Sequence, residues 1–395
     1  MAADSARING LARDPVAASA SKEDISPEAD GAEAEPLDGQ EAARRAGLRW
    51  VSDTAPGISR KKQNGKFHFI GRDGVPIADA ATRGRLESLV IPPAWEGVWI
   101  TPVPNGHIQA TGRDARGRKQ YIYHPKWLAA RDSTKYHRMR DFGRRLPALR
   151  KAVRKDLRRH GLGRERVAAA VVYLLDLTAI RIGNEQYARE NKSFGLTTLR
   201  NRHVKVHGER VRFTFVGKGG KKHDLELSDR RMAKVLARCA ATPGQRLFQF
   251  FDDKHQQHAL HSADVNDYLR GLTHRSFTAK DFRTWTGSVL AARHLAELEP
   301  PKTKTEGKRQ LTAMLGEVSG ALGNTPAVCR KCYIHPAVIE GYLDGSLSKA
   351  WRKNAGQWQR AARDPYELLL LRMLENQTRS SNASDTRSKA KRRKH

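Results

Sequence analysis

The chain has 395 residues, with 73 Lys and Arg against 42 Asp and Glu, so its formal net charge at pH 7 is +31. This length is typical of two or three domains, and the isoelectric point of about 10.4 is typical of a protein that binds nucleic acid. Hydrophobic residues make up 38% of the chain and Gly adds 32 residues, a composition that is globular and excludes a disordered polycation.

Two features of the sequence bear on its cellular compartment. No segment approaches the roughly 18 uninterrupted apolar residues of a transmembrane helix, and the N-terminus lacks the basic and then apolar pattern of a secretory signal. The three cysteines, Cys239, Cys329 and Cys332, are too few for a disulfide framework. We therefore expect a cytoplasmic protein with reduced thiols and no membrane partner.

Both ends of the chain differ in composition from the rest. Residues 1–44 contain ten acidic and four basic residues and no aromatic residue, which predicts a disordered acidic arm. Residues 379–395 contain seven Lys and Arg against one Asp and end in Lys391-Arg392-Arg393-Lys394, which predicts a basic disordered tail. Such a tail either is solvated or loosely binds phosphates.

Between the ends, the patterns predict two domains. Short runs rich in aromatic and β-branched residues, at 66–70, 97–100 and 121–123, alternate with Gly, Pro, Asn and Asp and predict a β-rich domain over 45–128. A mostly helical domain is predicted over 129–378, with Ser262 and Thr278 as N-caps. Apolar periodicity places its helices at 164–190, 230–240, 262–272, 278–298, 306–322 and 326–332.

The helical domain also contains a predicted β insert. Residues 203–207, 210–216 and 222–227 alternate as strands and are separated by tight turns containing Gly, which predicts three short antiparallel strands. The expected fold class is therefore α+β: a small β-rich N-terminal domain followed by a larger, mostly helical domain with a three-stranded insert.

Several common chemistries are excluded by the motifs. Gly-Lys occurs at 65–66, 217–218 and 307–308 but is never followed by Ser or Thr, so no P-loop and no nucleotide are expected. Cys329, Cys332 and His335 offer three zinc ligands without a fourth, which favours ordinary reduced thiols. No carboxylate cluster resembles a two-metal nuclease site. We expect neither cofactor nor metal.

Three basic residues are candidates for handling phosphate. Arg181, in an apolar stretch that the periodicity predicts to be helical, is either a buried ion-pair partner or a guanidinium that binds phosphate with two hydrogen bonds. Lys218, flanked by glycines in a hairpin, is either solvated or a mobile proton donor. Arg283 lies early in a capped helix, at the end where anions are favoured.

With their neighbours, these residues resemble the active site of the type IB DNA topoisomerases, most closely the compact bacterial and poxvirus branch. The resemblance spans about residues 47–347, and its motifs occur in the same order and with compatible spacing. The segment 112–123 resembles the part of the family's β domain that contacts DNA. The other matching segments are 180–183, 195–199, 215–218, Asp281-Phe282-Arg283-Thr284-Trp285, Leu322-Gly323-Asn324-Thr325-Pro326 and Tyr333.

The resemblance implies a role for each matching residue. Tyr333 would be the nucleophile, with Arg181, Lys218 and Arg283 as its helpers. Asn324 stands where poxvirus and eukaryotic members have His. Because an amide donates a hydrogen bond but cannot carry charge or transfer a proton, we expect an orienting and electrostatic role for it.

The resemblance also implies a DNA-contacting segment in the β domain. Tyr121 and Tyr123 would touch DNA, although tyrosines that alternate along a strand can equally pack one face of a core. The residues expected to bind DNA are Arg118, Lys119, Gln120, Tyr121 and Tyr123.

The implied activity is relaxation of supercoiled double-stranded DNA by a monomer on the cytoplasmic nucleoid. One strand would be cut through a 3′-phosphotyrosine intermediate and resealed, without ATP or metal. A tyrosine recombinase shares the Arg, Lys, Arg and Tyr pattern, but usually has His where this chain has Lys280 and begins with a helical domain. A non-catalytic architectural binder of DNA or RNA is the other alternative, and it predicts no covalent adduct.

Overall fold

The computed structural model describes residues 7–9, 39–115 and 117–377. The chain forms two compact units, one of residues 16–137 and one of residues 1–15 with 138–395. The division follows His137, inside helix α3 (Pro125–Asp156); the boundary predicted after residue 128 lies in the same helix. Among the described residues, no helix is both long and apolar enough to cross a membrane.

The smaller unit is built on an antiparallel sheet, as its alternating pattern predicts. The strand order is β3-β2-β4-β5-β6, and helix α2 (Ala80–Ser88) contributes Leu86 to the core beneath it. Asp79 caps this helix by accepting a hydrogen bond of 2.7 Å from Thr82 N–H. The strands are β2 (Ile58–Gln63), β3 (Lys66–Ile70), β4 (Glu96–Ile100), β5 (Ile108–Arg113) and β6 (Lys119–Tyr123).

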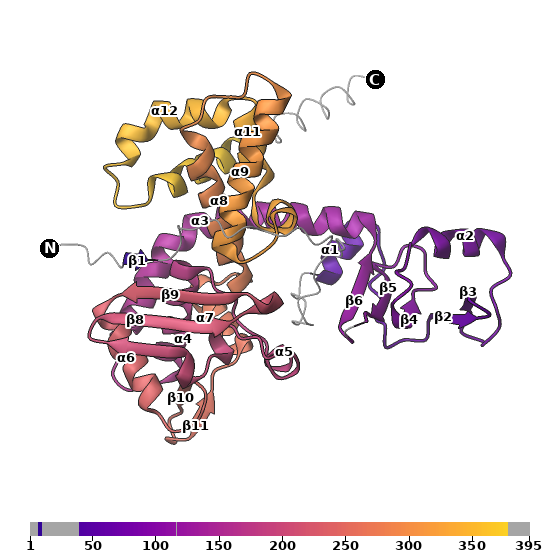
Figure 1. The fold of residues 1–395 in the computed structure, drawn as a ribbon, viewed down its shortest axis with the longest axis horizontal. Coiled ribbons are helices and arrows are strands. Elements are labelled where there is room, and N and C mark those ends of the chain that lie inside the picture. The colour runs from indigo at the N-terminus through magenta and orange to yellow at the C-terminus, as the bar shows by residue number, and fades with distance from the viewer. Residues whose placement is uncertain (1–6, 10–38, 116, 378–395) are drawn as a thin grey trace. The chain divides into compact units, whose positions relative to one another are not determined.

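The larger unit contains the predicted β insert as an antiparallel sheet (Figure 1). Its strands are β7 (Val204–His207), β8 (Arg210–Val216) and β9 (Lys222–Ser228). Along β8, Val211, Phe213 and Phe215 are buried while their neighbours are exposed, which is the period of two expected for a sheet with one solvated face. In Figure 1, α6 (Arg230–Ala241) lies behind this sheet, where it packs against β7 and β8.

Two parts of the predicted disordered arm are ordered, which corrects the prediction for residues 7–9 and 39–44. Strand β1 (Arg7–Asn9) pairs with the outer edge of β9, so the sheet has four strands where the sequence predicts three. An edge strand has unpaired backbone groups that a further strand can satisfy. Helix α1 (Gly39–Arg45) buries Ala43 against Leu48 and Trp127. The rest of the predicted arm, and the predicted tail at 379–395, lie outside the described residues.

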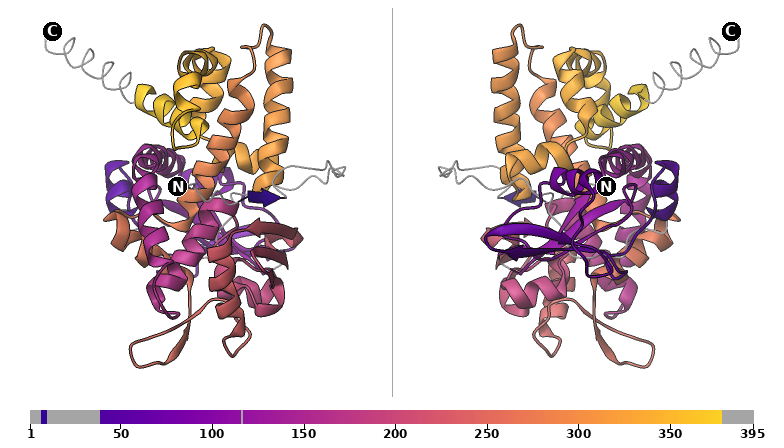
Figure 2. Two further views of the ribbon diagram at one scale, coloured as in Figure 1. Left: turned by 90° about the vertical axis from the view of Figure 1, so that its left-hand side faces the viewer. Right: turned by 90° about the vertical axis from the view of Figure 1, so that its right-hand side faces the viewer.

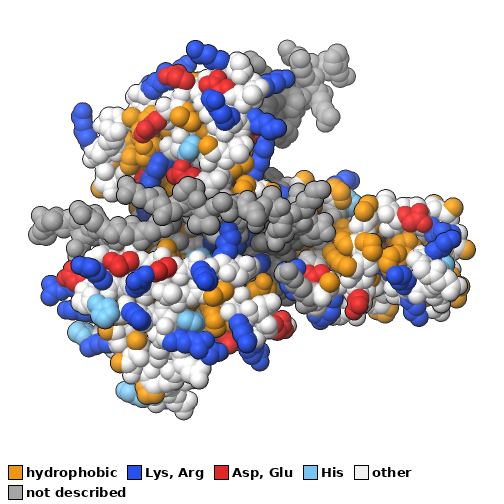
Figure 3. Space-filling view, in the orientation of Figure 1, with side chains coloured by type: hydrophobic (Ala, Val, Ile, Leu, Met, Phe, Trp, Pro, Cys, Tyr) orange, Lys and Arg blue, Asp and Glu red, His pale blue; other side chains and the backbone are white. Residues whose placement is uncertain are grey.

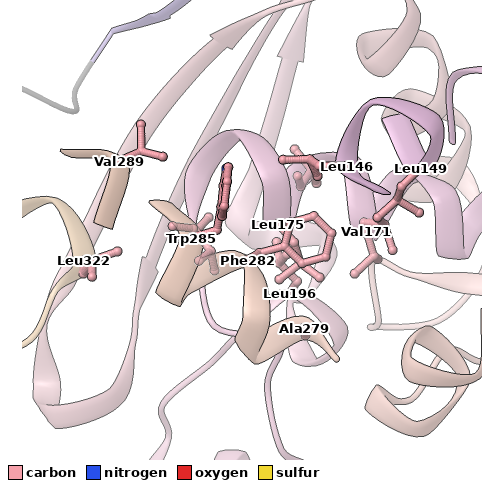
Figure 4. Packing of buried hydrophobic residues seen from close by; sticks show 14 of the residues in the cluster. Leu146, Leu149, Val171, Leu175, Leu196, Ala279, Phe282, Trp285, Val289 and Leu322 are labelled. Carbon is pink, nitrogen blue, oxygen red and sulfur yellow. The ribbon is translucent and has the colours of Figure 1, made fainter. Parts of the chain in front are cut away.

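The helices of the larger unit pack around one continuous core (Figure 2). Figure 4 shows Phe282 and Trp285 of α8 among Leu146 and Leu149 of α3 and Leu175 of α4. The elements are α4 (Arg164–Thr178), α5 (Glu185–Asn191), α6 (Arg230–Ala241), β10 (Gln249–Phe251), β11 (Gln257–Ala259), α7 (Ser262–Thr273), α8 (Ala279–Ala296), α9 (Lys304–Leu322), α10 (Pro326–Val328), α11 (Pro336–Leu343), α12 (Ser346–Trp358) and a helical segment at 365–377.

Two predicted helices are wrong in detail. The helix predicted over 164–190 is broken, because Ala179 adopts a left-handed φ of 50° and ends α4. The chain is irregular until α5 begins at Glu185. The helix predicted over 326–332 is the short α10 followed by a π-helical turn, Cys329–Tyr333. Both changes occur at residues that the sequence assigns to chemistry, where local strain is common.

A buried carboxylate connects the helices that carry the site. Glu367 is 5% exposed and accepts hydrogen bonds from Arg150 at 2.7 Å, from Arg363 at 2.9 Å and from the indole N–H of Trp285 at 3.1 Å. Arg150 also pairs with Asp176 of α4 at 2.7 Å. Residues 365–377 are thereby tied to α3, α4 and α8.

We expect Glu367→Gln to lower the free energy of unfolding at pH 7 by about 3 kcal/mol, because it removes a buried charge that pairs with both Arg150 and Arg363 and leaves Arg150 only Asp176 as a partner among the described residues. Burial alone would raise the pKa of Glu367, but the bonds from Arg150 and Arg363 lower it below its ordinary value of 4.5. Its stabilising contribution is therefore present above about pH 4.5 and is lost as the pH falls through the folded-state value.

Urea unfolding of the wild type and of Glu367→Gln at pH 7 and pH 4 measures this loss and its pH dependence. The difference in unfolding free energy between the two proteins should be smaller at pH 4 than at pH 7. Glu375→Gln is the matched control, since Glu375 forms a more exposed pair with Arg144 at 2.7 Å and should contribute less than about 1 kcal/mol. Equal losses for the two variants would contradict the assignment.

Candidate active site

Arg181 lies in the irregular segment between α4 and α5. Its backbone carbonyl accepts a hydrogen bond of 2.9 Å from Leu196 N–H, which anchors the segment to the turn at 195–199. Its guanidinium donates to the carbonyl of Gly323 at 3.4 Å and to Oδ1 of Asn324. Among the described residues, the guanidinium of Arg181 is thus held by a carbonyl and an amide oxygen and by no carboxylate, which favours the phosphate-binding interpretation of this residue.

Arg283 lies in the second turn of α8 and is 5% exposed. The predicted capping box is present, since Thr278 N–H donates to Asp281 at 2.8 Å. The Arg283 guanidinium donates to the carbonyl of Leu322 at 2.8 Å and to the carbonyl of Ala179. It therefore joins the two loops that carry Arg181 and Asn324.

Asn324 follows the C-terminus of α9. Gly323 ends that helix with a left-handed φ of 62°, a conformation that glycine adopts without strain. Asn324 is 6% exposed; its Oδ1 accepts from Arg181, while its Nδ2 makes no hydrogen bond to any described residue. The amide therefore retains a donor at the place where both guanidinium groups converge.

Tyr333 is the last residue of the π-helical turn and is 5% exposed. Its ring centroid lies 4.9 Å from the guanidinium carbon of Arg283. Its carbonyl accepts a hydrogen bond of 3.3 Å from Ser288, and a methyl group at Gly287 would approach that oxygen to 2.7 Å. Gly287 thus allows the turn to pack closely against α8.

The β8–β9 hairpin places two lysines differently. Its turn is Lys218–Gly220, in which Gly219 and Gly220 have φ of 74° and 73°. The Lys218 ammonium lies 5.8 Å from the ring centroid of Tyr187 on α5. The Lys221 ammonium instead donates to the carbonyl of Asn324 at 3.2 Å.

The site formed by Arg181, Arg283, Lys221, Asn324 and Tyr333 is strongly electropositive. It affects the pKa values of two neighbouring groups. Burial, together with Arg181, Arg283 and Lys221, lowers the pKa of His223 to about 4. Burial raises the pKa of the Cys329 thiol to about 11, although the same cations oppose the rise. At neutral pH the imidazole is therefore uncharged and the thiol is protonated.

The structure thus brings together Arg181, Arg283, Asn324 and Tyr333, from four separate segments of the chain. Lys218 lies on the same hairpin as Lys221 but contacts α5. Sequence reasoning missed His223 as a member of the site. The available signal was its position in β9, two residues after Lys221, because residues two apart in an extended chain lie on one face.

The cysteines that precede Tyr333 take part in packing. Cys329 is buried in the main core. His335 caps α11 by accepting a hydrogen bond of 3.0 Å from Ala337 N–H. Within the described part of the chain, no three His, Cys, Asp or Glu side chains are grouped as metal ligands.

The residues expected to contact DNA lie on and beside β6 of the smaller unit. Tyr121 and Tyr123 are half-buried and stacked, with ring centroids 5.7 Å apart. Lys119 pairs with Asp53 at 2.5 Å. Arg118 and Gln120 both donate to Asp114, at 2.7 and 3.0 Å. These contacts fix the side chains along one strand.

Comparison with known proteins agrees with this geometry. Residues 124–359 match the family model of the catalytic core of eukaryotic DNA topoisomerase I, and residues 66–114 match the N-terminal domain of bacterial DNA topoisomerase IB. DNA topoisomerase 1B of Acanthamoeba polyphaga mimivirus is 30% identical over 293 residues, which cover 72% of this chain and 87% of the relative.

More distant relatives have the same kind of name. DNA topoisomerase 1B of vaccinia virus (strain Copenhagen) is 21% identical over 244 residues, 59% of this chain and 72% of the relative. DNA topoisomerase 1 of Schizosaccharomyces pombe is 32% identical over 176 residues, 44% of this chain and 20% of the relative. Because the core model spans more than half of the sequence and the mimivirus protein is matched over most of its length, the chain belongs to the type IB DNA topoisomerase family.

Proposed function

We propose that this protein relaxes supercoiled double-stranded DNA by cutting one strand, holding its 3′ phosphate on Tyr333, allowing the duplex to rotate, and resealing the strand. The observation that carries the proposal is the convergence of Arg181, Arg283, Asn324 and Tyr333 in one electropositive site. All of them come from one chain, which supports a monomeric enzyme. Its three Cys, which are too few for a disulfide framework, support action on the nucleoid in the cytoplasm.

In the cleavage step, the Tyr333 oxygen attacks the phosphorus and the bond from phosphorus to the 5′ oxygen breaks. The phenol gives its proton to water, and the departing 5′ oxygen gains one from Lys218, the candidate general acid, which becomes a neutral amine. Religation reverses each transfer. Lys218 lies on a turn with two glycines of positive φ, which supports a side chain that can approach the leaving oxygen when DNA binds.

Charge stabilisation is assigned to the two arginines and the amide. The transition state gathers negative charge on the nonbridging oxygens, and donors fixed beforehand at those positions favour it over the ground state. Each such donor is typically worth about 3–4 kcal/mol. Arg283, close to the Tyr333 ring, also favours the phenolate that develops during attack.

The proposed reaction needs no external energy source. The phosphotyrosine conserves the bond energy of the cleaved phosphodiester, so resealing requires neither ATP nor a metal ion. The missing P-loop in the sequence supports this interpretation.

DNA binding is assigned to the basic charge of both units. Figure 3 shows Lys and Arg side chains spread over the face formed by β7, β8 and β9. In the smaller unit, the residues proposed to contact sugar, phosphate or base edges are Arg118, Lys119, Gln120, Tyr121 and Tyr123. Lys and Arg that neutralise phosphates release counterions, so binding should weaken with salt.

The proposed role of the basic tail is testable through this salt dependence. Deleting residues 379–395 removes a net charge of +6. If the tail contacts phosphates, the slope of log K against log salt becomes shallower by up to about 5, while the turnover at saturating DNA stays similar. Binding titrations from low to high salt measure the slope, and a tail of equal length rich in Gly and Ser is the control. An unchanged slope would show that the tail is only solvated.

Plasmid relaxation tests the proposed function as a whole. In EDTA and without ATP, the protein should relax both positively and negatively supercoiled plasmid through a ladder of intermediate topoisomers. DNA binding without relaxation would support an architectural role instead. A requirement for ATP or a divalent ion would contradict the proposed chemistry.

A further inference from the structure

His223 occupies a defined place between the hairpin and the loop that carries Asn324. Its ring stacks on Phe215, the residue opposite it in the β8–β9 pair, with centroids 4.7 Å apart and planes 10° apart. A methyl group placed on Gly217 would come within 2.6 Å of its Nε2, and one placed on Gly323 would lie 3.5 Å from its Cε1. The Nε2–Cε1 edge of the ring is therefore fixed toward both turns.

The groups that face this ring come from several elements and are cationic. They are Arg181 from the segment after α4, Arg283 from α8 and Lys221, which directly precedes β9. The three cations disfavour the protonated form of His223, so its ring is neutral and its surroundings favour an anion. An anion bound among these cations would balance their charge. The buried Nδ2 of Asn324 is a further hydrogen-bond donor, and it has no partner among the described residues.

We propose that His223 is a further catalytic residue, which donates a hydrogen bond from its imidazole to a nonbridging oxygen of the scissile phosphodiester beside Asn324. This inference rests on the proposed function. In this chain Asn324 uses its Oδ1 to accept from Arg181, and His223 supplies an imidazole next to Gly323 of the same loop. The ring donates as a neutral group, so it adds a directed hydrogen bond without adding repulsion to the three cations.

The test uses His223→Phe, which preserves the stack on Phe215 and removes the N–H. At a cleavage site mapped with the wild type, single-turnover formation of the covalent adduct should slow about 10- to 100-fold, the effect of one hydrogen bond to a charged group. DNA affinity should change less than about twofold, because the other phosphate contacts remain. His207→Phe, on the exposed face of β7 in the same sheet, is the matched control and should cut normally.

Modified DNA then separates contact from a packing effect. In a methylphosphonate, one nonbridging oxygen at the scissile position is replaced by a methyl group, in either of two diastereomers. If His223 donates to one oxygen, the ratio of wild-type to His223→Phe rates should fall close to one for one diastereomer only. His223→Gln, which keeps an N–H donor, should recover part of the rate on unmodified DNA.

Two results would overturn the inference. One is cleavage by His223→Phe at the wild-type rate. The other is an equal loss of cleavage rate for His223→Phe and His223→Gln on unmodified DNA and on both methylphosphonate diastereomers. That result would show that His223 acts through packing alone. If the wild type itself forms no adduct with unmodified DNA, the proposed function fails, and that outcome is distinct from both.

Discussion

Tyr333→Phe should abolish relaxation and covalent adduct formation while the protein still folds and binds DNA. The substitution removes one oxygen from a ring that is 5% exposed, so the packing of the turn against α8 is preserved. Without the hydroxyl no phosphotyrosine can form, and losses approaching about 10⁶-fold are typical when a covalent nucleophile is removed. Plasmid relaxation, adduct trapping and a DNA-binding titration measure the three properties separately.

The control for this variant is the same substitution at another tyrosine. Tyr366 lies in the helical segment 365–377, and its hydroxyl donates to Glu297 at 2.6 Å. Tyr366→Phe should relax DNA at the wild-type rate. Relaxation by Tyr333→Phe would contradict the assignment of Tyr333 as the nucleophile, and with it the proposed mechanism.

Lys218→Ala should slow cleavage by roughly 10²–10⁴-fold if Lys218 protonates the departing 5′ oxygen. A substrate with sulfur in place of that bridging oxygen has a much better leaving group, which scarcely needs a proton. The variant should therefore recover most of its cleavage rate on the sulfur substrate. Single-turnover cleavage of matched oxygen and sulfur duplexes measures the rescue.

The arginines provide the internal comparison for this rescue. Arg181→Ala and Arg283→Ala should gain less from sulfur, because these residues act on nonbridging charge. If Lys218→Ala is rescued no better than they are, the general acid is another group. Lys221 is then the first candidate, since its ammonium already lies 3.2 Å from the Asn324 carbonyl, and Lys222 is the second. If none of the three lysine variants is rescued, the hairpin lysines bind phosphate and the proton has another source.

The fold was predictable where a single local rule decides the structure. The alternation of Val211, Phe213 and Phe215 fixes which face of β8 is buried. Thr278 and Asp281 fix the start of α8, and therefore place Arg283 in its second turn. The resemblance to the type IB DNA topoisomerases similarly implied roles for Arg181, Asn324 and Tyr333.

The features that local rules did not predict, such as the end of α4 and the contact of Lys221, depend on contacts between distant segments. Ala179 has a high helix propensity, so no local signal ends α4 there. The break is held by Arg283, which donates to the Ala179 carbonyl from a helix about a hundred residues later in the chain. Likewise, the Lys221 ammonium contacts the Asn324 carbonyl from a position directly after Gly219 and Gly220, about a hundred residues earlier in the chain. Periodicity describes one element at a time and cannot encode such contacts.

Identification of the covalent adduct tests the central claim most directly. Relaxation is stopped with denaturant, the DNA and the protein are digested, and the modified peptide and the linked DNA end are determined by mass spectrometry. The account predicts a single adduct, in which Tyr333 is joined to a 3′ phosphate and the other end of the nick carries a free 5′ hydroxyl. An adduct on another residue, a link to a 5′ phosphate, or relaxation without any adduct would contradict it.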